Sequence, residues 1–271
     1  MKIHVCPPSN ELKDYVVQYW SLESAAETDL SEQLIYPTAS TEMMFHYGRP
    51  FVSRTEGQAP KNQKPEMLCG QKTVSAFVRP HEEIGVFVAT FTAAGASVFL
   101  RENFSLFRNT NASLESIIGP RVKELHERIG NAPSFGERVR LMEWFLKKNI
   151  IQRRAWRLEP IIHASRFASQ NCYAATVEQM AREACVSFRT LDRLFQTHIG
   201  LSPKEFLRIE RLKFAIGLMR TRNRLSLTEI AIDSGYFDQP HFNKDFKNVI
   251  GITPAGFRSM IDSAPVCLPE G

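Results

Sequence analysis

Two clusters of polar side chains near the carboxyl end of the chain are the best candidates for chemistry. The first cluster holds Ser187, Arg189, Thr190, Asp192, Arg193 and Gln196. The second cluster holds Gln239, Pro240, Asn243, Lys244 and Lys247. Arginine is the side chain best suited to bidentate hydrogen bonding with guanine, and lysine suits a phosphate group. These residue types favour recognition of a polyanion over the making and breaking of bonds.

An internal repeat must position both clusters. Residues 177–206 and 227–257 share a pattern at an offset of about 50 residues. Matched pairs are Ala181 with Ala231, Phe195 with Phe246, Gly200 with Gly251, Pro203 with Pro254, and Phe206 with Phe257. Only two copies are present, so a two-part module is indicated rather than a long array.

The first copy has the pattern of a helix-turn-helix. Thr176 and Gln179 are spaced as a capping box before a first helix, and the chain breaks at Cys185 and Val186. Ser187 is a predicted N-cap of a second helix. Apolar spacing places the following residues on the inner face of that second helix: Leu191, Leu194, Phe195 and His198.

The second copy repeats the arrangement. Its first helix carries the stripe Leu227, Ile230 and Ala231. Gly235 is expected in a left-handed turn, and Asp238 is expected to cap the second helix, with Pro240 in its first turn. The predicted inner face of that helix comprises His241, Phe242, Asp245, Phe246 and Val249. Residues 208–219 are predicted to form the helix that joins the two copies, and His198 and His241 are interpreted as packing residues.

The double helix-turn-helix resembles the DNA-binding domain of the AraC/XylS family of bacterial transcription regulators over residues 158–260. The resemblance rests on Gly-x-Ser/Thr-Pro-x-x-Phe after each second helix. It also rests on a run in the second copy: Gly235, Tyr236, Asp238, His241, Phe242, Lys244, Phe246 and Lys247. It implies a sequence-specific regulator of double-stranded DNA, with activation as the commoner mode and RNA polymerase as a partner. The two second helices would enter successive major grooves about 34 Å apart.

Roles for the polar residues follow from this arrangement. Arg189 is the predicted base reader, whereas Arg193 suits either a base or a phosphate. Asp192 either accepts a hydrogen bond from a cytosine amino group or orients Arg189. In the second copy Lys247 is a candidate phosphate contact, and Pro240 can only touch a thymine methyl group. We expect the second copy to carry less sequence information than the first.

Bulk properties agree with two domains in a cytoplasmic protein. The chain has 271 residues and a net charge of +5, which suits a polyanionic partner without proving one. Its five cysteines are scattered, without metal-ligand spacing, and no secretory leader is recognised. No apolar run approaches the roughly 18 residues of a membrane span. We expect no membrane association, no metal and no cofactor.

Residues 1–120 read as a small, mostly β domain, so the fold class is α+β. Expected strands are 43–47, 75–78 and 85–91, residues 12–20 form a helix or a strand, and helices follow at 94–99 and 114–118. This half resembles the sensor-like domain of many AraC-type regulators, through Tyr19-Trp20, Tyr36-Pro37, Cys69-Gly70 and the run 85–88. The resemblance implies a cupin-like barrel that binds a small effector. The His-x-His pair of a metal cupin is missing.

Residues 121–157 are interpreted as a helical dimerisation or linker segment, and residues 261–271 as a tail. Their predicted helices, 122–129 and 135–150, carry an apolar stripe: Val122, Leu125, Ile129, Phe135, Val139, Met142 and Phe145. Two interpretations stay open, namely a homodimer interface and packing on the chain's own barrel. The cations Lys147, Lys148, Arg153, Arg154 and Arg157 form either a solvated face or a supporting phosphate contact.

An enzyme is not expected. The sequence holds neither a glycine-rich phosphate loop nor a Gly-x-Ser-x-Gly elbow, and His81-Glu82 and His126-Glu127 do not complete a zinc-protease motif. Two alternatives remain: a DNA-repair alkyltransferase fusion, which would require four zinc-binding cysteines, and an interaction protein that has lost DNA binding.

Overall fold

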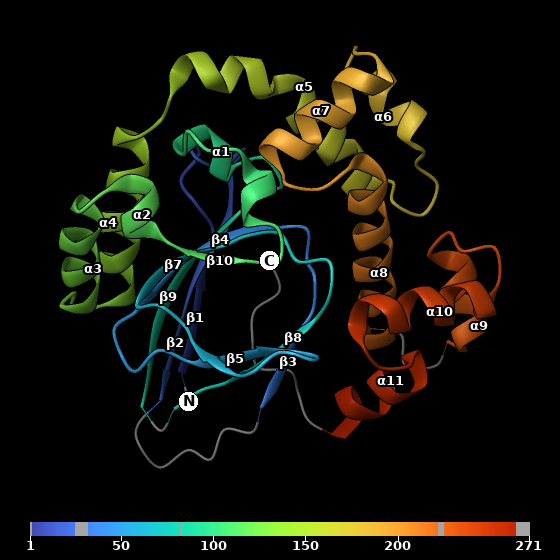
Figure 1. Ribbon diagram of the computed structural model, residues 1–271, viewed down its shortest axis with the longest axis horizontal. Coiled ribbons are helices and arrows are strands. Elements are labelled where there is room, and N and C mark those ends of the chain that lie inside the picture. The colour runs from blue at the N-terminus through green and yellow to red at the C-terminus, as the bar shows by residue number, and fades with distance from the viewer. Residues whose placement is uncertain (1, 25–31, 82, 222–224, 264–271) are drawn as a thin grey trace.

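The computed structural model describes residues 2–24, 32–81, 83–221 and 225–263, and for residues 152–157 and 262–263 the backbone alone. A β-rich N-terminal half carries helices on one side and is followed by an all-helical C-terminal half (Figure 1). The α+β organisation predicted from the sequence is confirmed.

Within the described residues, ten strands form two antiparallel sheets. The strands are β1 Lys2–Cys6, β2 Val16–Ser24, β3 Gln33–Ile35, β4 Thr41–His46, β5 Val52–Thr55, β6 Lys61–Asn62, β7 Glu66–Cys69, β8 Ala76–Arg79, β9 Ile84–Phe91 and β10 Asn111–Ser113. The six-stranded sheet has the order β1-β2-β9-β4-β7-β10, and the four-stranded sheet has the order β3-β8-β5-β6. The strands predicted at 43–47, 75–78 and 85–91 correspond to β4, β8 and β9. Residues 12–20 are divided between a turn and the start of β2.

Strand β9 is the centre of the N-terminal half. All eight of its residues are buried, because helices cover one face of the six-stranded sheet and the smaller sheet covers the other. Successive side chains alternate between the faces. Phe87 and Phe91 pack toward the helices, whereas Val86 and Val88 pack toward the smaller sheet. Such double burial explains why the strand is almost continuously apolar.

Short helices follow the sheets: α1 Ala96–Phe99, the 3₁₀ helix η1 Phe104–Phe107, α2 Leu114–Ile118, α3 Arg121–Gly130 and α4 Phe135–Lys148. The apolar stripe of α3 and α4 belongs to the same core as the six-stranded sheet. Val122, Ile129 and Met142 are fully buried there, and Phe135 lies 6.1 Å from Phe87 between ring centroids. Of the two interpretations of the stripe, packing on the chain's own barrel is the one observed.

The C-terminal half contains seven helices among the described residues: α5 Gln152–Gln170, α6 Val177–Glu183, α7 Phe188–His198, α8 Pro203–Thr221, α9 Leu227–Asp233, α10 Gln239–Ile250 and α11 Pro254–Ser263. The expected boundary between residues 157 and 158 falls inside α5. The linker and the helix-turn-helix half therefore share one continuous helix. None of the described helices has the length and apolar character needed to cross a bilayer.

The hydrophobic cores do not follow the boundary between the halves. The first helix-turn-helix shares one continuous core with the six-stranded sheet, through residues such as Leu191, Phe195 and Phe206. The second has a separate core that includes Leu34 and Tyr36 of the N-terminal half. Each helix-turn-helix is thus held against the N-terminal half by buried apolar contacts.

Candidate nucleic-acid interface

The first unit, α6 and α7, begins each helix with a side-chain cap. Thr176 and Gln179 form the expected capping box, since the Thr176 amide donates to Gln179 Oε1 at 2.8 Å and the Gln179 amide donates to Thr176 Oγ1 at 3.2 Å. Ser187 Oγ accepts from the Thr190 amide at 3.2 Å, which confirms Ser187 as the N-cap of α7. Caps of this kind are typically worth about 1 kcal/mol.

The second unit, α9 and α10, follows the same local rules. Ser226 and Glu229 form a capping box at α9, a signal that the sequence contains but that was not among the expectations. Asp238 Oδ1 accepts from the His241 amide at 2.7 Å and caps α10 as expected, with Pro240 in the first turn. Phe242 and Phe246, on the inner face of α10, are fully buried.

The turn between the helices requires a left-handed residue in both units. Gly235 has φ +80°, as the sequence indicates, and an added Cβ would lie 2.0 Å from the carbonyl oxygen of Tyr173. At the matching place in the first unit stands Cys185, with φ 52°. A residue with a Cβ is strained in this region, by roughly 1–2 kcal/mol. The same turn is therefore unstrained in the second unit and strained in the first.

Helix α8 joins the units and is tied to both. It has 19 residues, so its length is about 28 Å at 1.5 Å per residue. Arg211 donates to the carbonyl oxygens of Cys172 and Ala175, at 2.8 and 3.0 Å. Arg208 forms an ion pair with Asp245 of α10 at 2.6 Å. These two arginines therefore hold the units together through their hydrogen bonds and ion pair.

The outer face of α7 presents Arg189, Arg193 and Gln196 to solvent, while Leu191 and Phe195 are buried. Asp192 is half-buried, and its Oδ2 accepts from Gln196 Nε2 at 2.8 Å. Asp192 thus orients Gln196, four residues later, rather than Arg189. The structure brings the whole first cluster to one helix and its N-cap.

The outer face of α10 is less uniform. Lys244, Lys247 and Pro240 are exposed. Gln239 accepts from Thr228 Oγ1 of α9 at 2.6 Å. Asn243 was expected to point outward, but it is half-buried and its Oδ1 is buried without a hydrogen-bond partner among the described residues.

The two histidines, both interpreted as packing residues, are placed differently. His241 is exposed, so its expected place on the inner face of α10 was wrong. Its ring lies edge-on to Tyr236, 5.3 Å between centroids, because the Asp238 cap starts the helix with His241 at its rim. His198 is half-buried and lies 3.4 Å from Ser97 Oγ of the N-terminal half.

Asp245 is half-buried between Arg208 and the hydroxyl of Tyr236, which donates to it at 2.9 Å. Burial, followed by this carboxylate, raises the pKa of Tyr236, so its phenol stays a neutral donor.

Two exposed aromatic residues were missed by the sequence reasoning. Phe188, the first residue of α7, is 58% exposed, and Phe237, directly before the α10 cap, is 89% exposed. Both lie at the amino end of an outward-facing helix. The usable signal was an aromatic residue next to an N-cap, where it cannot reach the core. Large exposed apolar side chains often mark contact surfaces.

Helix α7 also faces the N-terminal half. Arg189, Asp192, Arg193 and Gln196 line a surface hollow together with Asn103 and Ser105 of the η1 segment. Close by, Arg108 forms an ion pair with Glu205 in the first turn of α8. The polar face of α7 is therefore bordered on one side by η1.

Comparisons with known proteins agree with this geometry. Residues 180–260 match the family model of a helix-turn-helix domain (HTH_18), and residues 4–113 match a domain of unknown function (DUF6597). An uncharacterized HTH-type transcriptional regulator of Haemophilus influenzae is 38% identical over 85 residues, which are 31% of this chain and 28% of the relative. The HTH-type transcriptional activator RhaS of Salmonella arizonae is 35% identical over 99 residues, 36% of this chain and 34% of RhaS. The matched segment thus spans about a third of the length of these relatives.

Solved structures are also similar. The DNA-binding domain of AdpA, determined in complex with a target DNA, is 27% identical, with a TM-score of 0.36 over 38% of this chain and 94% of that one. ToxT from Vibrio cholerae O395 is 13% identical, with a TM-score of 0.48 over 90% of this chain and 97% of that one.

Two capped helix-turn-helix units on one connecting helix define a double helix-turn-helix protein. Residues 180–260 are an AraC-type helix-turn-helix domain of the kind that DNA-binding transcriptional regulators carry, and the relative RhaS shares this domain.

Proposed function

We propose that the protein is a sequence-specific transcriptional regulator that places α7 and α10 in successive major grooves of double-stranded DNA. The observation that carries the proposal is the pair of helices joined by α8, each with a buried apolar face and an exposed cationic face. Helix α7 offers Arg189 and Arg193, and α10 offers Lys244 and Lys247. A helix of this kind fits the major groove, and cations offset the phosphate charge.

The exposed groups divide into base readers and phosphate contacts. Arg189 lies in the first turn of α7, where a reading helix meets the base edges, and suits guanine. Gln196 and Asp192, joined by their hydrogen bond, form a second polar unit on the same face. Lys247 lies in the last turn of α10, which suits the phosphate backbone. The half-buried Asn243 leaves fewer free polar groups on α10, so the first unit carries more of the sequence information.

The experiment uses the full-length protein and a duplex selected from a random library. Binding by fluorescence anisotropy is expected to weaken with salt, linearly in log Kd against log salt concentration. Arg189→Ala should lower the preference for the selected site by about 1–3 kcal/mol at one base pair. Lys247→Ala should weaken the selected and scrambled duplexes alike.

Lys123→Ala is the matched control, because Lys123 is an exposed cation paired with Glu115 on the N-terminal half. It should leave both affinities unchanged. A failure to bind any duplex at low salt would favour the alternative of an interaction protein that has lost DNA binding. Identical behaviour of Arg189→Ala and Lys247→Ala would overturn the division of roles.

Four finer points belong to the same proposal: activation through RNA polymerase, control by a small effector, a homodimer and a cytoplasmic location. The activator RhaS supports the first. A cavity in the β domain supports the second. A homodimer would use a surface other than the buried stripe of α3 and α4. In-vitro transcription from a promoter carrying the selected site tests activation, and light scattering tests the dimer.

A further inference from the structure

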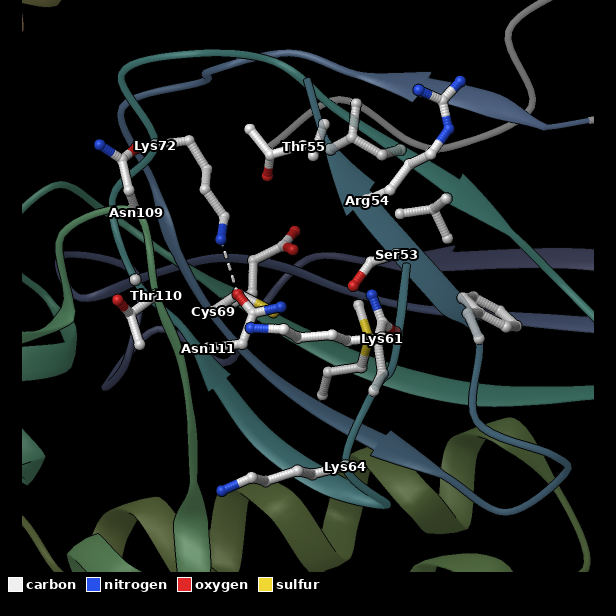
Figure 2. A pocket seen from close by; sticks show the side chains of 18 of the residues that line it. Ser53, Arg54, Thr55, Lys61, Lys64, Cys69, Lys72, Asn109, Thr110 and Asn111 are labelled. Carbon is white, nitrogen blue, oxygen red and sulfur yellow. Dashed lines mark hydrogen bonds between the residues drawn. The ribbon is translucent and has the colours of Figure 1, made fainter. Parts of the chain in front are cut away.

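The N-terminal half contains a cavity of about 490 Å³ between its two sheets. Trp20 of β2, Met44 of β4 and Cys69 of β7 line it from the larger sheet, and Ser53 of β5 and Val78 of β8 line it from the smaller one. Figure 2 shows this cavity, with the β5 to β6 hairpin and residues 109–111 around it. Its volume lies in the usual range for small-molecule sites.

The charges around the cavity are predominantly positive. Lys61, Lys64 and Lys72 line it, and no ion pair joins any of the three to an acid in the described part of the chain. Lys72 Nζ donates to Asn111 Oδ1 at 2.7 Å. The lysines Lys61 and Lys72 extend into the cavity from different sides (Figure 2). A lysine that points into a cavity without a counter-ion favours an anionic occupant.

One acid, Glu42, lines the same cavity and forms no ion pair with the lysines in the described part of the chain. Glu42 Oε1 accepts from Thr90 Oγ1 at 3.1 Å, and Trp20 Nε1 donates to the same hydroxyl at 3.3 Å. Burial raises the pKa of Glu42, which disfavours its charged form, and burial lowers the pKa of Lys72. An incoming anion would favour the charged form of Lys72.

The remaining lining is polar above an apolar floor. Amides and hydroxyls surround the opening: Ser53, Asn62, Asn109, Thr110 and Asn111. Trp20, Met44 and Phe51 form the floor and are nearly inaccessible. Such a lining offers hydrogen-bond partners to hydroxyl groups and an apolar surface for the body of a small ligand.

We propose that this cavity binds a compact organic anion that carries hydroxyl groups, of the sugar-acid or sugar-phosphate class. Lys61 and Lys72 hold the anionic oxygens, and the amides and hydroxyls of the rim hold the body of the ligand. The body lies on the floor formed by Trp20 and Met44.

The wall of the cavity contacts the C-terminal half. Tyr36 and Thr38 line the cavity. Tyr36 belongs to the core of the second helix-turn-helix and lies edge-on to Phe257, 6.0 Å between centroids. Lys213 of α8 donates to the carbonyl oxygen of Thr38 at 3.4 Å. The ligand therefore contacts the segment against which α8 and α11 pack. The inference that a bound ligand alters DNA affinity rests on the proposed function.

The binding test needs no DNA. Full-length protein is titrated with gluconate, galactarate, glucose 6-phosphate and fructose 1,6-bisphosphate, and with glucose and octanoate, by calorimetry and tryptophan fluorescence. At least one hydroxylated anion is expected to bind at least ten-fold more tightly than glucose and octanoate. The sugar acids and the phosphates distinguish a carboxylate from a phosphate. No binding by any of the four anions, or equal binding of glucose, overturns the proposal, as does preference for octanoate.

Variants locate the site. Lys72→Met and the more exposed Lys61→Met should each weaken binding of the best anion at least ten-fold. Lys13→Met, an exposed lysine outside the lining, should leave it unchanged. Equal affinity of both cavity variants and wild type for the anion would overturn the cavity as its binding site.

The best anion is then added to the anisotropy assay. A change in DNA affinity is expected, and Lys72→Met should abolish it. DNA binding that ignores a bound anion would overturn only the coupling, and ligand binding without DNA binding would overturn only the proposed function.

Discussion

Gly200 lies directly against the backbone of Phe104, so that an added Cβ would be 2.6 Å from the Phe104 carbonyl oxygen. The contact joins the turn after α7 to η1 of the N-terminal half. Gly251 occupies the matching place in the second unit with nearly the same backbone, φ +87° against +91°, and its Cβ would meet only Glu56 Oε2 at 3.9 Å. The repeat thus contains one glycine needed for conformation alone and one also needed for contact between the halves.

This pair yields a matched experiment. Gly200→Ala and Gly251→Ala both place a Cβ in the left-handed region, which costs roughly 1–2 kcal/mol. Gly200→Ala should destabilise the protein by at least about 1 kcal/mol more in urea unfolding. Hydrogen exchange should also quicken at residues 100–110 in that variant alone. Equal losses would show that the contact contributes nothing.

The strained turn at Cys185 gives a prediction of opposite sign. Cys185→Gly removes a Cβ from a residue with φ 52°. We expect the free energy of unfolding to increase by about 0.5–1 kcal/mol, because the relief of strain exceeds the cost of the greater freedom of glycine in the unfolded chain. Thermal unfolding measures it. Gly235→Ala, at the matching turn, should be strongly destabilising because its Cβ would lie 2.0 Å from the Tyr173 carbonyl oxygen. A loss of stability in Cys185→Gly would contradict this account of the turn.

Buried His46 predicts a dependence of stability on pH. Its Nε2–H donates to Gln63 Oε1 at 3.0 Å, and Nδ1 is buried without a partner among the described residues. Burial lowers the pKa of His46 to about 4 from 6.5. Between these values the unfolded chain binds the extra proton, so the free energy of unfolding falls as the pH decreases, by at most about 3 kcal/mol. In urea unfolding between pH 7 and 5, His46→Gln should make the free energy of unfolding depend less on pH. The exposed His163→Gln should keep the pH dependence of the wild type. An unchanged slope in His46→Gln would assign the effect to other groups.

The exposed Phe237 predicts a loss of DNA affinity without a loss of stability. At 89% exposure its ring contributes little to folding, yet it stands beside the first turn of α10. We expect Phe237→Ala to weaken binding of the selected duplex several-fold through lost apolar contact with sugar or thymine methyl groups. Its melting temperature should match that of wild type. Val5→Ala, a 53% exposed apolar residue on β1, is the control. Unchanged affinity would make Phe237 incidental to DNA binding.

Local rules predicted most of the C-terminal half. Caps at Thr176, Ser187 and Asp238, and apolar spacing such as Leu191 with Phe195, depend on neighbours within a few residues. The neighbours of the polar residues were out of reach where they come from distant segments. Asn103 and Ser105 beside α7 are one case, and Thr38 under Lys213 is another. His241 was misplaced for a different reason, because helical spacing alone does not reveal that a cap places a residue at the rim.

The continuity of the first core has a consequence for building hybrid regulators. An exchange of DNA-binding halves at residue 158 would divide α5 and separate Leu191, Phe195 and Phe206 from the sheet-side residues with which they share a core. The second unit, whose core takes the buried Leu34 and Tyr36 and the partly buried Phe77 from the N-terminal half, shares fewer buried residues with that half. Grafting is therefore better tolerated at α8 than at the domain boundary read from the sequence.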